Sequence, residues 1–238
     1  MSKSKNIYLP GGGKQLELML EQIDVKGMSV LVMGSACEEI AITFAKLTGE
    51  TVELIVEDLD SMLNANLILE KHDNINVKIM EFDVTDFSNA SFDLIYAQAS
   101  VSSFKRNQVV KEIKRLLKDN GTLCVGEVTK LSEDVPTYVQ NVFDSSDIEP
   151  LFEKNLQSYY KQRKFEIIGE WDLKDTLKEY FGHNLKKLEQ TKTDLGDDEK
   201  KYYKKLLNKI SHDSNVYIKQ GGDKYIGFKV LLLRKENN

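Results

Sequence analysis

The sequence has few of the features that mark secreted, membrane-spanning or nucleic-acid-binding proteins. Its 238 residues include two cysteines, Cys37 and Cys124, too few for a disulfide framework or a zinc cluster. No apolar run approaches the ~20 residues of a membrane span, and no apolar segment follows the charged N-terminus as in a secretory signal. The net charge of −5 gives no reason to expect nucleic acid as a partner. We therefore expect a cytoplasmic protein without a metal site and without a membrane or nucleic-acid partner.

Short apolar segments alternate with helical patterns along most of the chain. This alternation predicts an α/β fold, a doubly wound and mostly parallel sheet with helices on both faces. Right-handed crossovers then place the carboxyl ends of the parallel strands at one edge, where ligands bind. The predicted strands are Met28–Met33, Val52–Val56, Val77–Phe82, Phe92–Tyr96, Thr122–Val128, Phe165–Trp171 and Tyr225–Leu233.

The chain is most simply one domain spanning residues 1–238. Residues 1–27 form an N-terminal loop and helix, with Pro10 and the following glycines in the loop. Residues 172–213 are strongly charged and helical, and we interpret them as an insertion before the last strand. The sequence allows this insertion to be either a cap over the active edge or an arm that forms a homodimer.

The end of the first strand carries the most informative segment, residues 30–39. An apolar strand breaks at Gly34 and turns into a helix, as in nucleotide-binding folds, and a glycine lets the backbone approach a ligand closely. Glu57 ends the second strand, where a carboxylate can accept hydrogen bonds from a ribose diol. Asp83 ends the third, where it can accept from an adenine amine. A turn acid and a helix N-cap are the alternatives for these two, but the three residues in this order are more specific than any one.

These residues make the chain resemble the class I S-adenosylmethionine-dependent methyltransferases. The resemblance is to the small-molecule branch that includes the ubiquinone-biosynthesis and arsenite methyltransferases. It extends from Leu9 to Val128, and the segments Ser91–Ile95 and Leu116–Leu123 are among those that carry it. It implies a seven-stranded sheet whose last strand is antiparallel, with S-adenosylmethionine over the first three strand ends. The cofactor residues that it implies are Gly34, Ser35, Ala36, Glu57, Asp58, Met62, Asp83, Val84 and Gln98.

The glycine-rich loop departs from the pattern of this family. Val32, Ala36 and Glu38 stand where the family has an acid and two glycines. Ala36 is a mild change if its φ is negative, whereas Glu38 brings an anion near a carboxylate-bearing cofactor unless its side chain turns to solvent. A non-catalytic partner or sensor protein of the same fold is therefore the alternative to methyl transfer onto a small molecule.

The methyl acceptor and the catalytic residues are not evident in the sequence. Gln98 lies at the expected boundary between cofactor and substrate, and Trp171 and His183 are weaker candidates for substrate contacts. Core packing is the competing role for Trp171. The segment from Ala97 to Ser100 lacks the cysteine that arsenic chemistry uses. A nicotinamide-dependent oxidoreductase is disfavoured because the G-x-G-x-x-G loop is absent.

Overall fold

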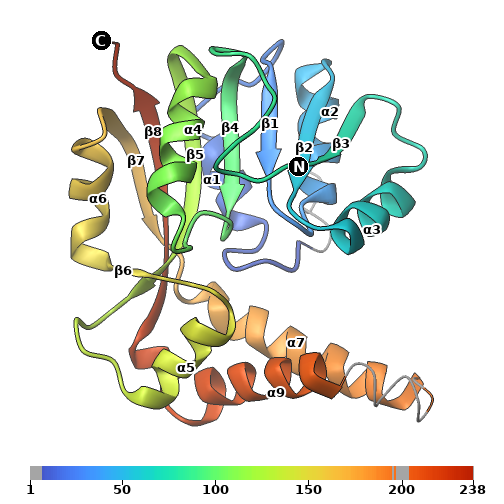
Figure 1. The fold of residues 1–238 in the computed structure, drawn as a ribbon, viewed down its shortest axis with the longest axis vertical. Coiled ribbons are helices and arrows are strands. Elements are labelled where there is room, and N and C mark those ends of the chain that lie inside the picture. The colour runs from blue at the N-terminus through green and yellow to red at the C-terminus, as the bar shows by residue number, and fades with distance from the viewer. Residues whose placement is uncertain (1–6, 195, 197–203, 238) are drawn as a thin grey trace.

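The computed structural model describes residues 7–194, 196 and 204–237, and these form one sheet with helices on both faces (Figure 1). The sheet has eight strands in the order β3-β2-β1-β4-β5-β8-β7, and the short β6 pairs with β5. Among the described strands, β8 runs antiparallel to both of its neighbours, β5 and β7, and the other pairings are parallel. The strands are β1 (Val30–Met33), β2 (Val52–Val56), β3 (Ile75–Ile79), β4 (Phe92–Gln98), β5 (Leu117–Lys130), β6 (Leu151–Phe152), β7 (Phe165–Asp172) and β8 (Ile226–Lys235). The predicted fold class is confirmed, with β6 as an unpredicted addition.

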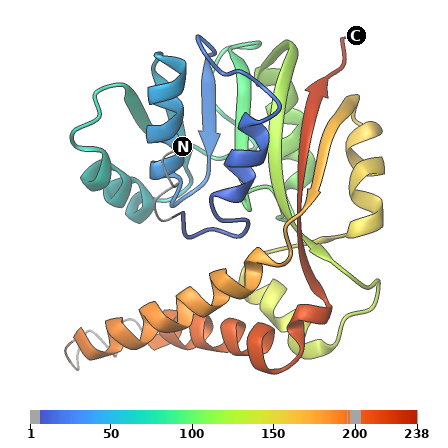
Figure 2. The same cartoon turned by 180° about the vertical axis from the view of Figure 1, so that it is seen from behind.

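The helices divide between the two faces of the sheet and one of its edges. They are α1 (Lys14–Leu20), α2 (Glu38–Thr48), α3 (Leu59–Leu69), α4 (Arg106–Leu116), α5 (Thr137–Ser145), α6 (Glu153–Lys161), α7 (Thr176–Asp194) and α9 (Lys204–Lys219), labelled as in Figure 1. A short 3-10 turn, Gly222–Lys224, precedes β8. Figures 1 and 2 show α4 and α6 on one face and α1 and α2 on the other.

The alternation of side chains along each strand produces two apolar cores. In β1, Val30 and Val32 belong to the core on the α1 and α2 side. Leu31 and Met33 belong to the core on the α4 and α6 side. All four side chains are at most 1% exposed. Strands buried on both faces read as continuous apolar runs, which is why the sequence predicts them well.

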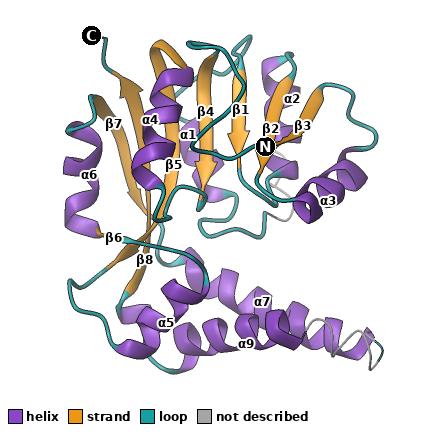
Figure 3. Ribbon diagram, in the orientation of Figure 1, coloured by secondary structure: helices purple, strands orange, loops and turns teal. Residues whose placement is uncertain are grey.

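Three helices form a lobe at the carboxyl edge of the sheet. We call α5, α7 and α9 the helical lobe; α9 packs against both of the others. Figures 1 and 3 show that β1 and β4 point toward this lobe. In the chain order, α7 and α9 come between β7 and β8, where the sequence predicts a helical insertion. The helix α9 continues to Lys219, beyond the predicted end of the insertion.

The third strand ends earlier than the sequence predicts. It stops at Ile79, because its pairing partner β2 stops at Val56 and the Met80 amide makes the last bond to the Val56 carbonyl. Asp83 therefore follows the strand by several residues, in a turn bridged by Glu81 and Val84. The correction moves Asp83 away from the strand end that the sequence assigns to it.

Candidate functional site

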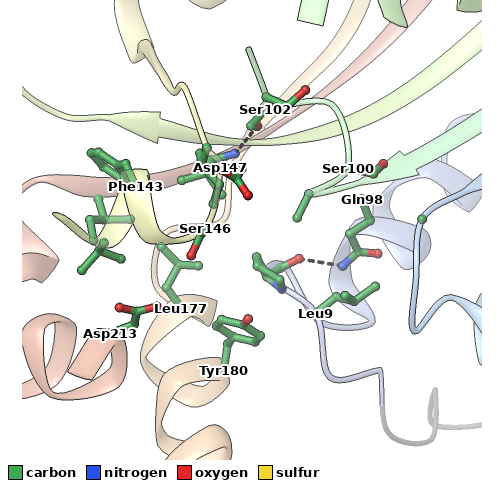
Figure 4. A pocket seen from close by; sticks show the side chains of 18 of the residues that line it. Leu9, Gln98, Ser100, Ser102, Phe143, Ser146, Asp147, Leu177, Tyr180 and Asp213 are labelled. Carbon is green, nitrogen blue, oxygen red and sulfur yellow. Dashed lines mark hydrogen bonds between the residues drawn. The ribbon is translucent and has the colours of Figure 1, made fainter. Parts of the chain in front are cut away.

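A cavity of about 470 Å³ lies between the carboxyl edge of the sheet and the helical lobe (Figure 4). From the sheet edge it is lined by Gly34, Ser35, Glu57, Phe82, Gln98, Ala99 and Ser100, among others. From the lobe it is lined by Phe143, Ser146, Leu177, Tyr180, Asn184, Lys209, Asp213 and Ser214, among others. Strand ends and lobe thus enclose one space large enough for a small ligand.

The loop after β1 is held close to the loop after β4. Gly34 has a φ of 136°, and a Cβ there would lie 3.2 Å from the Cβ of Ser100. The Ser100 hydroxyl donates a 2.8 Å hydrogen bond to the Met33 carbonyl. Only glycine fits this position without moving its neighbour, because of both the backbone angle and the space. The strand end predicted to approach a ligand is therefore a tight backbone turn at the wall of the cavity.

Ala36 adopts a left-handed backbone conformation. Its φ is 59°, so the condition under which alanine would be a mild replacement for glycine is not met. A left-handed conformation costs about 1 kcal/mol in a residue with a Cβ. Residue 36 therefore has a backbone conformation that favours glycine, although the residue there is alanine.

Glu57 and Asp58 follow β2 but have different surroundings. Glu57 lines the cavity, and its Oε1 accepts a 3.0 Å hydrogen bond from the Phe82 amide. Oε2 and the remaining lone pairs stay available for a diol. Asp58 caps α3 instead, accepting from both the amide and the hydroxyl of Ser61 at 2.7 Å. The hydrogen bonds from Ser61 lower the pKa of Asp58.

The residues expected around adenine lie outside this cavity. Asp83 pairs with Lys105, whose Nζ lies 3.1 Å from Oδ1 and also binds Glu81. Val84 is 73% exposed, and Met62 is half-buried on α3. Met62 lies on α3 after β2, and Asp83 and Val84 lie in the turn after β3, so none of the three is on the cavity wall. The Lys105 partner of Asp83 is a contact that the sequence does not predict.

Gln98 holds the N-terminal loop against the sheet. Its Nε2 donates to the carbonyl oxygens of Pro10 and Gly12 at 2.7 and 2.9 Å. Its Oε1 accepts from the Tyr96 hydroxyl at 2.7 Å. The side chain is 2% exposed, so its polar atoms are committed to the protein while its surface forms part of the cavity wall (Figure 4).

Val32 and Glu38, the other departures in the loop, both have buried side chains. Val32 is fully buried in β1 and Glu38 is 6% exposed in the first turn of α2. Burial raises the pKa of Glu38, and its own backbone amide partly offsets that shift. The Glu38 side chain therefore does not turn out to solvent, and it does not line the cavity.

The two weaker substrate candidates also lie away from the cavity. Trp171, on β7, packs against the core, which is the competing role that the sequence allows. His183 stacks on Tyr8, with ring centroids 3.8 Å apart. It lines a neighbouring hollow of about 670 Å³ with Lys14 and Glu17. Burial and the nearby Lys187 and Lys186 lower the pKa of His183.

The lobe contributes polar residues that the sequence does not single out. Lys209, Asp213 and Ser214 on α9 and Tyr180 on α7 face the cavity. Burial raises the pKa of Tyr180, a hydrogen bond with Asn184 lowers it, and the charge of Asp213 raises it further. Among the described residues, no group of three or more histidine, cysteine, aspartate or glutamate side chains could hold a metal ion.

Comparison with known proteins bears on this arrangement directly. Residues 34–125 match a methyltransferase domain. The match begins at Gly34 and ends within β5, so it contains the sheet-edge residues of the cavity from Gly34 to Ser100 that are named above. It bears out the prediction of a methyltransferase enzyme. No curated protein shows significant sequence similarity to the chain, and no described helix is long and apolar enough to cross a membrane.

Solved structures share the whole fold at low sequence identity. The [4+2]-cyclase SpnF has a TM-score of 0.78 at 14% identity, over 100% of this chain and 85% of that one. Phosphoethanolamine N-methyltransferase 2 from Haemonchus contortus has a TM-score of 0.77 at 14% identity, over 98% and 55%. Geranyl diphosphate C-methyltransferase from Streptomyces coelicolor A3(2) has a TM-score of 0.69 at 11% identity, over 94% and 78%. These likenesses confirm the fold.

Proposed function

We propose that the protein transfers a methyl group from S-adenosylmethionine to a small-molecule acceptor held under the helical lobe. The observation that supports this most directly is the meeting of Gly34, Ser35 and Glu57 at one cavity that the lobe closes. The methyltransferase-domain match starts at the first of these residues. The resemblance that Leu116–Leu123 and the other segments carry supports placing the protein in the small-molecule branch of the class I enzymes.

The cavity residues fit the proposed cofactor at the strand ends. Gly34 permits a tight turn at the cavity wall, where a Cβ would lie only 3.2 Å from the Cβ of Ser100. Glu57 keeps free lone pairs for a ribose diol after its bond to Phe82. When bound, S-adenosylmethionine would supply an electrophilic methyl group on its sulfonium. The protein residues would bind it, orient it toward the lobe and exclude water, which is where much of the rate gain arises.

The helical lobe acts as a lid in this proposal. Residues of α7 and α9 line the cavity beside Gln98, which favours a lid over the alternative of a dimer arm. The two related enzymes named above are described with phosphomonomethylethanolamine and with geranyl diphosphate as ligands. Because these ligands differ so widely, the fold does not identify the acceptor. The two free, buried cysteines support our proposal that the protein works in the reducing cytoplasm.

A second candidate function is a non-catalytic protein of the same fold. It is favoured by the left-handed Ala36 and by Asp83, which already pairs with Lys105. Thermal denaturation with ~1 mM S-adenosylmethionine, S-adenosylhomocysteine or NAD separates the candidates. We expect the first two to raise the Tm by about 5 °C or more, as for a ligand well above its Kd, and NAD to have no effect. No shift with either sulfur compound would favour the second candidate, and a shift with NAD alone would overturn both.

A further inference from the structure

The lobe side of the cavity contains a buried hydroxyl without a partner. Ser214, on α9, is 1% exposed, lines the cavity, and its Oγ has no hydrogen-bond partner in the structure. Leaving a buried hydroxyl unpaired costs about 1–3 kcal/mol, so such groups are rare in native proteins. A group that faces a cavity can recover this cost when a ligand arrives. Ser214 is therefore a candidate contact for a ligand rather than a packing residue.

An ion pair on the same helix lies beside this hydroxyl. Lys209 Nζ is 2.9 Å from Asp213 Oδ2 and donates to the Ser146 hydroxyl at 2.6 Å. An ammonium has three donors and a carboxylate about four acceptor sites, so both groups keep hydrogen-bonding capacity. Their opposite charges largely cancel in this pair, and the other oxygen of Asp213 lies 3.1 Å from His212 Nδ1. A ligand bound next to the Lys209–Asp213 pair therefore meets both hydrogen-bond donors and acceptors, and the pair as a whole has little net charge.

These groups favour a ligand with hydroxyl chemistry. A hydroxyl both donates and accepts, so it can pair with Ser214 and with either member of the ion pair. A ligand of either charge would lose its hydration in the cavity without gaining a net opposite charge, because Lys209 and Asp213 already neutralise each other. Tyr180 and Phe143 line the neighbouring wall (Figure 4) and offer an apolar surface to the rest of the ligand.

We propose that the methyl acceptor is an uncharged small molecule with a hydroxyl group, which binds Ser214 beside the Lys209–Asp213 pair. This inference rests on the proposed function, since it names the substrate class for that same cavity. Ser214 is thus assigned a role in acceptor specificity.

Three matched compounds test the chemistry of this site. Benzyl alcohol, benzoate and benzylamine share one aromatic body and carry a hydroxyl, an anionic and a cationic group. Their affinities are measured by amide chemical-shift changes in protein saturated with S-adenosylhomocysteine. We expect benzyl alcohol to bind most tightly and to shift the amides around Ser214. Equal or tighter binding of benzoate or benzylamine, or no binding of any of the three, would overturn the proposal.

Ser214→Ala and Thr129→Val provide a matched pair of variants. Thr129 is also fully buried with an unpartnered hydroxyl, but it does not line the cavity. Removing either hydroxyl leaves stability unchanged or higher, because neither makes a hydrogen bond. Only Ser214→Ala should lower the affinity for benzyl alcohol. We expect a loss of about threefold or more, which is the scale of one neutral hydrogen bond. Equal affinities in Ser214→Ala and wild type would refute the site.

One control experiment distinguishes a wrong acceptor class from a wrong proposed function. Binding of S-adenosylhomocysteine is measured first by calorimetry, in wild type and in Ser214→Ala, and we expect equal affinities because Ser214 lies on the lobe side. If the cofactor product binds and the three compounds do not discriminate, only the acceptor class is wrong. If the cofactor product does not bind, the methyltransferase proposal fails, and the three compounds are then compared on the cofactor-free protein.

Discussion

The side-chain amide of Gln98, at the end of β4, donates a 2.7 Å hydrogen bond to the carbonyl oxygen of Pro10. The same amide binds the Gly12 carbonyl, and the Gly11 amide binds the Thr176 hydroxyl on α7 at 3.1 Å. The N-terminal loop therefore connects the sheet edge to the helical lobe. This connection fixes one wall of the cavity, since Leu9, Pro10 and Gln98 all line it.

Replacing Gln98 by alanine should destabilise the protein. Gln98→Ala removes three hydrogen bonds and leaves buried partners unpaired, so we expect the free energy of unfolding to fall by about 2–4 kcal/mol. Urea denaturation measures the loss. Gln140→Ala is the matched control, because Gln140 is exposed and its side chain bonds to Asp144 one turn away, and it should change stability by less than about 0.5 kcal/mol. Similar losses in the two variants would show that the N-terminal loop is not held by Gln98.

Ala36→Gly should stabilise the protein although it adds flexibility to the unfolded chain. The φ of 59° at Ala36 is costly with a Cβ and free for glycine, so we expect a gain of up to about 1 kcal/mol in urea denaturation. Ala41→Gly, in the middle of α2, is the control with the opposite sign and should lose about 1 kcal/mol. A loss of stability in Ala36→Gly would mean that the loop does not hold residue 36 in this conformation.

Both thiols should be unreactive while the protein is folded. Burial raises the pKa of Cys124 to about 12 and, together with the charge of Glu38, raises that of Cys37 still higher. At pH 8 we expect a thiol reagent such as DTNB to label neither cysteine in the native protein and both in guanidinium chloride. Fast labelling of the native protein would contradict this burial.

The same raised pKa values predict how stability depends on pH at the alkaline end. A thiol whose pKa is higher in the folded than in the unfolded protein favours folding fully below its unfolded pKa, near 9. Above that pH the unfolded chain loses its thiol protons first, so the free energy of unfolding should decrease as pH rises from about 9. Urea titrations at pH 7, 9 and 10 measure this decrease. Cys124→Ala should show a smaller slope than wild type.

The sequence predicts the strands well and the site less well, for physical reasons. Val30–Met33 and Val52–Val56 are buried on both faces, so their identity as strands follows from local composition. The end of β3 depends on where β2 stops pairing, a non-local property, and for this reason the sequence predicts Asp83 too close to the strand. The left-handed φ of Ala36 could not be predicted from an alanine.

The lobe residues could not be predicted because helical periodicity leaves the choice of polar face open. Residues 204–219 contain several lysines and one buried aspartate, Asp213. Nothing local distinguishes Lys209, which faces the cavity, from Lys204 or Lys205, which are exposed. Gln98 was expected at the cofactor–substrate boundary and does lie on the cavity wall. Its hydrogen bonds to the N-terminal loop span 86 and 88 positions in the chain, which a local pattern does not reveal.

The most direct test of the account is calorimetric binding of S-adenosylhomocysteine to wild type, Glu57→Gln and Glu39→Gln. Glu57→Gln keeps an oxygen for the Phe82 amide but loses the charge and one acceptor of the proposed ribose contact. Glu39 is exposed in the first turn of α2 and is the control. The account predicts binding to wild type and Glu39→Gln with similar affinity, and a loss of about tenfold or more in Glu57→Gln. Two results would contradict the account. One is no binding to wild type at ~1 mM ligand, a concentration well above the Kd expected for an enzyme cofactor. The other is equal affinity of Glu57→Gln and wild type.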